Sequence, residues 1–116
     1  MIWTGIAFAE FGHRDGRFLH APGLFGFVRR YTSDDCLLLF AGQAEDLARE
    51  AGPSHPMWAE ALRLGLNELH VHQPVLRRVD RLELLARVVR HPQPILNCLE
   101  EATASLPPLE HARLRA

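Results

Sequence analysis

Two apolar runs separated by a short polar stretch constrain the fold of this chain more than any other feature. Residues 24–31 and 36–41 are rich in bulky apolar side chains, and the four residues between them, 32–35, are polar. Pro22 and Gly23 precede the first run. This pattern is typical of a β-hairpin, because turn residues separate two runs of strand length. Since the second run is almost continuously apolar, we expect that strand to be central and buried on both faces.

Five further segments carry patterns typical of strands or helices. Alternating side chains predict strands, whereas helix-forming composition or three/four apolar spacing predicts helices. The predicted strands cover residues 2–11 and 68–73, and the predicted helices cover 44–51, 56–64 and 75–90. We expect the longest helix to face the core with Val75, Val79, Leu82, Ala86 and Val89. With the hairpin, these segments predict an α/β (α+β) domain, a small, mainly antiparallel sheet flanked by helices.

Length and composition predict one domain. The chain has 116 residues, with 47% hydrophobic and 23% charged residues, which is ordinary for a globular protein. We expect the domain at residues 1–97, with strand 2–11 as an extension, and a loosely attached tail at 98–116 with a short helical stretch at 98–105. The longest apolar run is far shorter than the roughly 20 residues that cross a bilayer. The N-terminus resembles no secretory signal, so we expect a cytoplasmic protein without a membrane partner.

Charge and cysteine content narrow the classes of partner. The net charge of −1 gives the domain no general basic field, so a nucleic acid would need a local patch. All 13 basic residues are arginine, which favours a GC-rich bacterial source. Cys36 and Cys98 are too few for a disulfide framework or a four-cysteine metal site, and we interpret them as small buried hydrophobic residues.

The order hairpin, helix, helix, strand, long helix and Pro-x-x-Asn resembles the GIY-YIG nuclease superfamily over roughly residues 22–97. Residues 22–25 (Pro-Gly-Leu-Phe) stand where the Gly-Ile-Tyr motif would lie, and residues 40–42 (Phe-Ala-Gly) stand where Tyr-Ile-Gly would lie. Asp46 and Leu47 resemble the Asn-Leu pair that follows, and residues 94–97 (Pro-Ile-Leu-Asn) resemble the closing motif. The resemblance implies the fold of that superfamily.

The resemblance also implies a reaction centre with two tyrosines, an arginine on the first helix and a glutamate that holds a divalent cation. A tyrosine hydroxyl can relay a proton, while arginine and metal neutralise charge on the phosphoryl group. Here both tyrosine positions hold phenylalanine, so we expect the shape to be kept and the chemistry to be lost. The family-equivalent positions are Phe25, Phe40, Gly42, Glu50, Leu85 and Asn97, with Arg49 and Glu83 as possible substitutes for the arginine and the glutamate.

We therefore expect a catalytically degenerate domain that binds nucleic acid or protein and needs no cofactor. A nucleic acid would contact the arginines of the last helix, which are Arg77, Arg78, Arg81, Arg87 and Arg90. The alternative interpretation of these arginines is a solvated helix face, on which their aliphatic stems lie over apolar surface. Glu83 precedes Arg87 by four residues, which is the spacing of an ion pair on a helix.

Two other functions remain open at this point. One is an active, structure-selective DNA endonuclease that uses Arg49, Glu83 and Mg²⁺ or Mn²⁺. The other is a small metal-binding protein in which His55 or His91 joins His70 and His72, which share one strand face.

Overall fold

The computed structural model describes residues 2–13, 20–91 and 94–97. The elements follow one another as β1 (Ile2–Trp3), β2 (Ile6–Ala7), β3 (Ala9–Gly12), β4 (Gly23–Thr32), β5 (Asp35–Ala44), α1 (Leu47–Glu50), α2 (Trp58–Arg63), β6 (Glu68–His72) and α3 (Arg78–Arg90), with a helical turn at 95–97. The predicted α+β class, a small antiparallel sheet flanked by helices, is confirmed. The predicted tail at 98–116, with its helical stretch and Cys98, lies outside the described residues.

The main sheet has the strand order β3-β6-β4-β5, and every neighbouring pair is antiparallel. β4 lies at the centre, where Phe25 pairs with Val71 of β6 and with Gly42 of β5. Because side chains alternate across a strand, β4 directs Phe25 and Phe27 to one face and other apolar residues to the opposite face.

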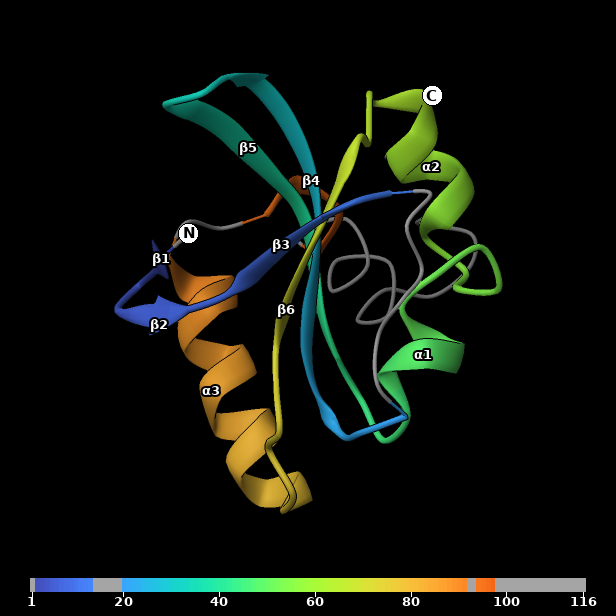
Figure 1. Ribbon diagram of the computed structural model, residues 1–116. Coiled ribbons are helices and arrows are strands. Elements are labelled where there is room, and N and C mark those ends of the chain that lie inside the picture. Colours follow the sequence, from blue (N-terminus) through green and yellow to red (C-terminus); the bar gives the residue numbers. More distant parts are fainter. Residues whose placement is uncertain (1, 14–19, 92–93, 98–116) are drawn as a thin grey trace, which may run out of the picture.

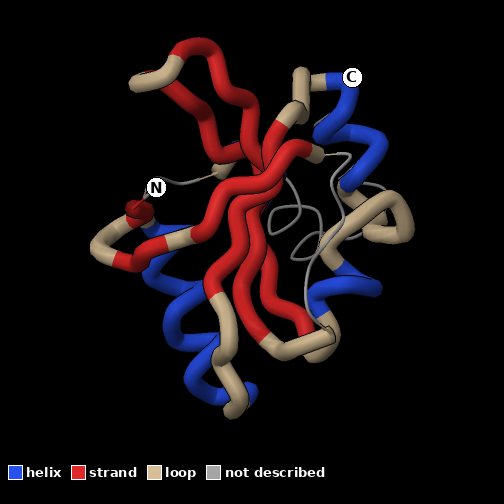
Figure 2. Tube along the Cα trace, viewed as in Figure 1, coloured by secondary structure: helices blue, strands red, loops and turns tan. Residues whose placement is uncertain are grey.

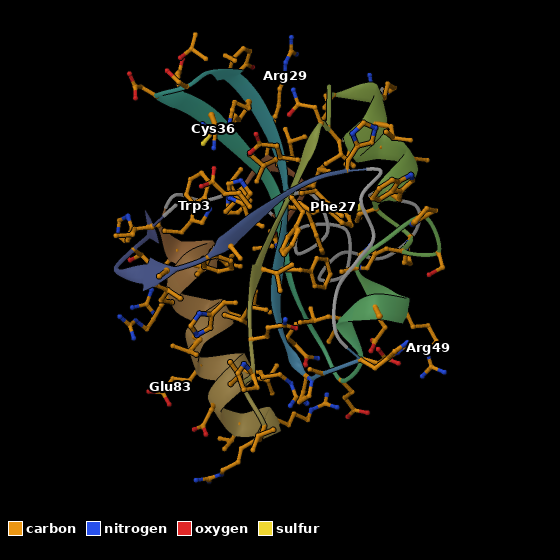
Figure 3. All side chains as sticks on the ribbon, viewed as in Figure 1. Trp3, Phe27, Arg29, Cys36, Arg49 and Glu83 are labelled. Atoms are coloured by element: carbon orange, nitrogen blue, oxygen red, sulfur yellow. The ribbon has the colours of Figure 1, made fainter. Side chains whose placement is uncertain are left out.

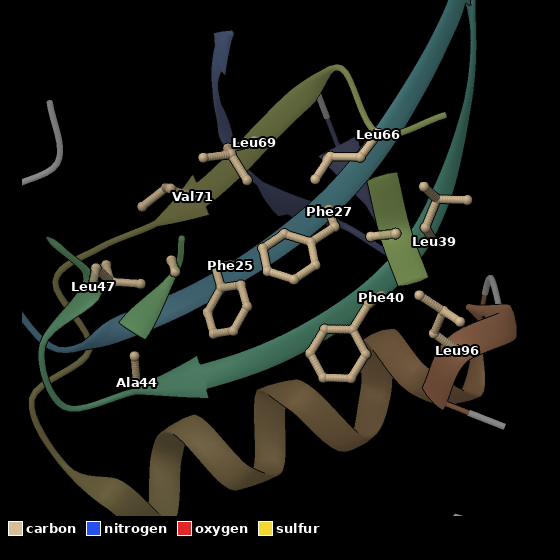
Figure 4. Close-up of a cluster of buried hydrophobic side chains, with 12 residues drawn as sticks. Phe25, Phe27, Leu39, Phe40, Ala44, Leu47, Leu66, Leu69, Val71 and Leu96 are labelled. Atoms are coloured by element: carbon tan, nitrogen blue, oxygen red, sulfur yellow. The ribbon is translucent and has the colours of Figure 1, made fainter. Parts of the chain in front are cut away.

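Helices cover both faces of this sheet, as Figures 1 and 2 show: α1 and α2 lie on one side, and α3 lies on the other. The first layer encloses an aromatic and aliphatic cluster, drawn in Figure 4, whose largest members are Phe25, Phe27, Leu39, Phe40, Leu47 and Leu69. The second layer encloses a smaller cluster of Ile6, Phe8, Leu24, Val28, Leu38, Ala41 and Val88, against which the partly buried Cys36 packs. We call these the α1/α2 face and the α3 face.

The prediction of a central second hairpin strand is wrong, since β5 lies at the sheet edge and β4 is central. β5 is apolar because both layers use it, with Leu39 in the α1/α2 cluster and Leu38 in the α3 cluster. Asn97 closes its edge: Oδ1 accepts the Ala41 N–H and Nδ2 donates to the Ala41 carbonyl, both at 2.7 Å. A strand covered on both faces is apolar whether or not it has two neighbours.

The predicted single strand at 2–11 is broken into three. β1 and β2 form their own antiparallel pair, and only β3 joins the main sheet, next to β6. Thr4 and Gly5 both have positive φ, at 49° and 83°, a region that glycine adopts readily. This turn reverses the chain and makes residues 2–7 a hairpin of their own, the N-terminal hairpin.

All three predicted helices start later than expected, and the one predicted at 56–64 is α2, which begins at Trp58. The helix predicted at 44–51 shortens to α1, because Ala44 is the last residue of β5. The helix predicted at 75–90 begins at Arg78, because the Val75 N–H donates to the carbonyl of Pro22 in an extended segment. In the part of the chain that the structure describes, no helix is long and apolar enough to cross a membrane.

The predicted core face of the longest helix is also wrong. α3 buries Val88 and Arg81, with Leu84 and Leu85 partly buried beside them, whereas Val79 is 55% exposed. The helix carries two apolar stripes, and the one with Leu84, Leu85 and Val88 meets the sheet. Arg81 fits this face because its guanidinium finds acceptors there. Of the residues predicted to face the core, Val75 is buried before the helix begins and Val89 is half-buried, whereas Val79, Leu82 and Ala86 are exposed.

Candidate functional site

The two positions that the resemblance predicts to match the family's tyrosines lie inside the α1/α2 cluster. Phe25 is 1% exposed and Phe40 is 4% exposed, with their ring centroids 6.1 Å apart. Phe27 lies beside both, at 5.3 and 5.7 Å. Figure 4 shows the three rings packed together on one face of the sheet. These rings are closed core, and no phenylalanine ring can pass a proton.

The ring of His55 packs against these three phenylalanine rings, with its centroid 5.0 Å from that of Phe40 and 5.4 Å from those of Phe25 and Phe27. Its Nδ1 accepts the Met57 N–H at 3.0 Å, so the neutral ring carries its proton on Nε2. Burial lowers the pKa of His55, and the charge of Glu50 offsets this only in part. His55 is therefore a neutral ring that covers the cluster.

Gly42 has a packing reason to be glycine. A Cβ at this position would lie 2.6 Å from Cζ of Phe25 and 3.1 Å from Cε2 of Phe40. The two rings thus occupy the space that any side chain at residue 42 would need.

The remaining family-equivalent positions also have local structural roles. The Glu50 carboxylate accepts the N–H groups of Glu45 and Asp46, at 3.0 and 2.8 Å, just before α1. Leu85 packs against the α3 cluster, and Asn97 holds the edge of β5. Each of these three side chains therefore stabilises the fold locally.

Arg49 and Glu83 are not brought together. Arg49 is an exposed residue of α1, and Glu83 is an exposed residue of α3. Since α1 and α3 cover opposite faces of the sheet, the two side chains lie on opposite sides of the molecule, as Figure 3 shows.

The predicted arginine patch is divided. Arg81 is 3% exposed: Nε donates to Oε1 of Gln43 at 2.9 Å, and one terminal nitrogen donates to the carbonyls of Val75 and Leu76, at 3.0 and 2.9 Å. It therefore ties α3 to β5 and to the segment before the helix. Arg77 lies 3.9 Å from Asp80, within ion-pair distance.

The exposed arginines of α3 do not form one stripe. Arg78 and Arg87 stand nine residues apart, which places them about 180° apart around the helix axis. Arg90 lies between them, close to the midline of the outer face. A phosphate backbone could not follow all of these side chains at once.

On the α3 face of the sheet, a group of polar side chains that the sequence did not predict surrounds the buried His70. Potential metal ligands of Glu10, Glu68 and His70 lie within 4.8 Å of one another. Arg30 lies among them: its Nε donates to Oε2 of Glu68 at 2.6 Å, and a terminal nitrogen donates to Glu10. The guanidinium thus takes the place a cation would occupy, and the donor set does not fit a metal.

The histidines predicted as metal ligands do not converge either. His70 contacts Trp3 and Glu68, and His72 contacts the carbonyl of Ala7. His55 lies on the opposite face of the sheet, and His91 is exposed after α3. Glu10, Arg30 and Glu68 come from three strands, so no local motif could have identified the group.

No protein-family model, curated protein or solved structure matches the chain. The GIY-YIG resemblance therefore stays a prediction that rests on the order of elements and on the residues named above.

Proposed function

We propose that this chain is a non-catalytic binding module of GIY-YIG-like architecture, and that it binds a second copy of itself through the outer face of α3. A cytoplasmic location remains part of this proposal. The observation that carries it is an exposed apolar ridge on the longest helix, together with a motif region that is filled by aromatic core.

A nuclease needs a proton carrier, a phosphate clamp and a cation ligand around one substrate phosphate. Here the proton carriers are replaced by Phe25 and Phe40, which are buried. The nearest substitutes for clamp and ligand, Arg49 and Glu83, lie on opposite faces of the sheet. This separation disfavours the endonuclease alternative and any Mg²⁺ or Mn²⁺ site between them.

The outer ridge of α3 consists of Val79, Leu82, Glu83, Ala86 and Arg90, all exposed. Val79 is 55% exposed and Leu82 is 44% exposed, and Leu76, just before the helix, is more exposed still. Single exposed apolar residues are ordinary, but a continuous row at helical spacing is typical of a surface that another helix covers. Protein is therefore favoured over nucleic acid as the partner.

The ridge is complementary to itself, which favours a second copy. Across the described residues, neither Glu83 nor Arg90 has an ion-pair partner. They stand seven residues apart on one stripe, with Ala86 close to their midpoint. If two α3 helices cross antiparallel at Ala86, Glu83 of each copy faces Arg90 of the other. The small Ala86 side chain lets the helices approach closely at the crossing.

The size of the ridge predicts a weak dimer. A helix of 13 residues is about 20 Å long, so one helix face buries less than the roughly 800 Å² per partner of a standard interface. We therefore expect association that depends on concentration in the micromolar to millimolar range, about 10 µM to 1 mM.

Sedimentation velocity across that concentration range tests the proposal. We expect Leu82→Glu to raise the dissociation constant by about tenfold or more, because it places a charge in the apolar contact. Leu62→Glu is the matched control, because Leu62 on α2 is exposed to the same 44%. Glu83→Arg should weaken the dimer, and adding Arg90→Glu in the same chain should restore it.

A chain that stays monomeric throughout the range, or a dimer that Leu62→Glu weakens as much as Leu82→Glu, overturns the proposal. Retention of DNA at low salt that disappears when Arg78, Arg87 and Arg90 are replaced by glutamine would instead assign the outer face of α3 to nucleic acid.

A further inference from the structure

Two histidines of β6 hold the N-terminal hairpin against the sheet, and their hydrogen bonds have opposite proton requirements. Nε1 of Trp3 donates to Nδ1 of His70 at 3.0 Å, and Nδ1 of His72 lies 2.8 Å from the carbonyl oxygen of Ala7. An indole N–H can only donate, and a carbonyl oxygen can only accept. Nδ1 of His70 must therefore be without a proton, whereas Nδ1 of His72 must carry one.

The second ring nitrogen of His70 is also in use. Nε2 lies 2.9 Å from Oε1 of Glu68, and a carboxylate accepts, so Nε2 carries the single proton of a neutral ring. The side chain is fully buried. His70 thus receives a hydrogen bond from β1 and donates one within β6.

A second proton has different consequences at the two histidines. At His70 it can bind only to Nδ1, where it would face the Trp3 N–H and remove its acceptor. The contact of His72 does not need an unprotonated nitrogen, because its Nδ1 already donates to the carbonyl of Ala7. The same fall in pH therefore breaks one contact and leaves the other.

The charges around His70 come from three strands. Glu68 of β6 and Glu10 of β3 favour the protonated ring, whereas Arg30 of β4 disfavours it. Cys36 of β5 lies opposite Arg30 in the sheet register, and burial raises the pKa of its thiol. Burial lowers the pKa of His70, more strongly than its acidic neighbours raise it. The proton therefore enters below the ordinary histidine value of about 6.5.

The N-terminal hairpin depends on such contacts because β1 and β2 pair only with each other. Ile6 is part of the α3 cluster and Trp3 packs against it, so the hairpin lies beside α3, as Figure 1 shows. We propose that His70 is a proton-sensitive latch: its protonation releases Trp3, and with it β1, while His72 keeps Ala7 in place. This proposal is independent of self-association and would hold for a monomer.

The indole resonance of Trp3 in ¹H–¹⁵N spectra reports the latch directly. The chain has two tryptophans, and Trp3→Phe assigns the resonance. As the pH falls from about 7.5 to the lowest value at which the chain stays folded, we expect it to move from its hydrogen-bonded position to that of a free indole. The midpoint should equal that of the His70 ring, followed in ¹³C-labelled histidine.

His70→Gln is the test variant, because its amide can accept from Trp3 and donate to Glu68 without titrating. We expect the Trp3 resonance of this variant to stay at the bonded position across the range. His72→Gln is the matched control, in which the Trp3 transition should persist.

If His70→Gln does not fold, as judged by circular dichroism, the two midpoints of the unsubstituted chain decide. A Trp3 resonance that does not change in this range, that changes equally in His70→Gln, or whose midpoint differs from that of His70, overturns the proposal.

Discussion

The two faces of the sheet bury different kinds of side chain. The α1/α2 face buries phenylalanine and aliphatic residues, with His55 as a neutral cover. The α3 face also buries His70 and Arg81, each with hydrogen-bond partners. Phe25, Phe40 and Gly42, which carry the two central motifs of the resemblance, lie on the first face, whereas the buried polar residues His70 and Arg81 lie on the second. Core packing therefore accounts for Phe25, Phe40 and Gly42, while the buried polar side chains lie on the other side of the sheet.

The largest expected effect comes from removing an aromatic ring of the α1/α2 face. Phe27→Ala should lower the free energy of unfolding by about 3–5 kcal/mol, because a fully buried ring leaves a cavity. Tyr31→Ala on the same strand is the control and should cost less than about 1 kcal/mol, since Tyr31 is exposed. Urea denaturation measures both, and equal losses would contradict the assignment of Phe27 to the core.

On the α3 face, Arg81 should behave as a structural residue. Arg81→Met should cost about 3 kcal/mol, because the carbonyls of Val75 and Leu76 and the amide of Gln43 lose their donor. Arg78→Met, an exposed position on the same helix, should stay within about 0.5 kcal/mol. Similar losses in both variants would show that Arg81 is not buried in the way described.

Gly42 provides a smaller test of the α1/α2 face. Gly42→Ala should cost about 2 kcal/mol, because its Cβ meets the rings of Phe25 and Phe40. Gly52→Ala is a matched control, since a Cβ there would meet nothing within 4 Å. Thermal unfolding of the two variants side by side separates them, and a neutral Gly42→Ala would mean that the rings are not closely packed.

Placing a tyrosine at residue 25, where the GIY-YIG resemblance predicts one, should not create nuclease activity. Phe25→Tyr should cost about 1–2 kcal/mol, because it places a hydroxyl in an apolar, closed cluster. A stabilised variant, or one that gains metal-dependent DNA cleavage, would argue that the cluster is an open site.

The smallest effect concerns the pH dependence of stability. Burial lowers the pKa of His55 in the folded state, so below about pH 6.5 the unfolded chain takes up a proton that the folded chain does not. Stability should therefore fall as pH falls below that value. His55→Asn keeps an acceptor for the Met57 N–H and should reduce this slope, as measured by denaturation at about pH 7 and pH 5. An unchanged slope would contradict a half-buried His55 that is neutral in the folded chain.

Local patterns were sufficient for the main elements of the fold. The apolar runs around the turn at 32–35 predicted β4 and β5, and alternation predicted a strand at 68–73, which the structure shows as β6 at Glu68–His72. The antiparallel α+β class followed from these and from the helix signals. Local patterns could not predict that β5 lies at the edge of the sheet. An apolar strand is one whose two faces are both covered, and this says nothing about how many strands pair with it.

Contacts between residues far apart in the sequence determine the features that local patterns did not predict, namely the buried face of α3 and the position of the N-terminal hairpin. α3 has two apolar stripes, and the stripe that meets the sheet contains Arg81, whose acceptors come partly from β5. The bond from Trp3 to His70 joins residues 67 positions apart. The first predicted strand is broken at Thr4 and Gly5. Gly5 is the only sequence signal of this break, and a single glycine does not distinguish a turn from a strand.

The central claim, that the motif region is closed core and holds no reaction centre, is tested most directly by incubating the purified chain with branched and nicked DNA and Mg²⁺ or Mn²⁺. We predict that the DNA stays intact at every protein concentration. Metal-dependent cleavage by the unsubstituted chain, lost in Glu83→Ala, would contradict the account.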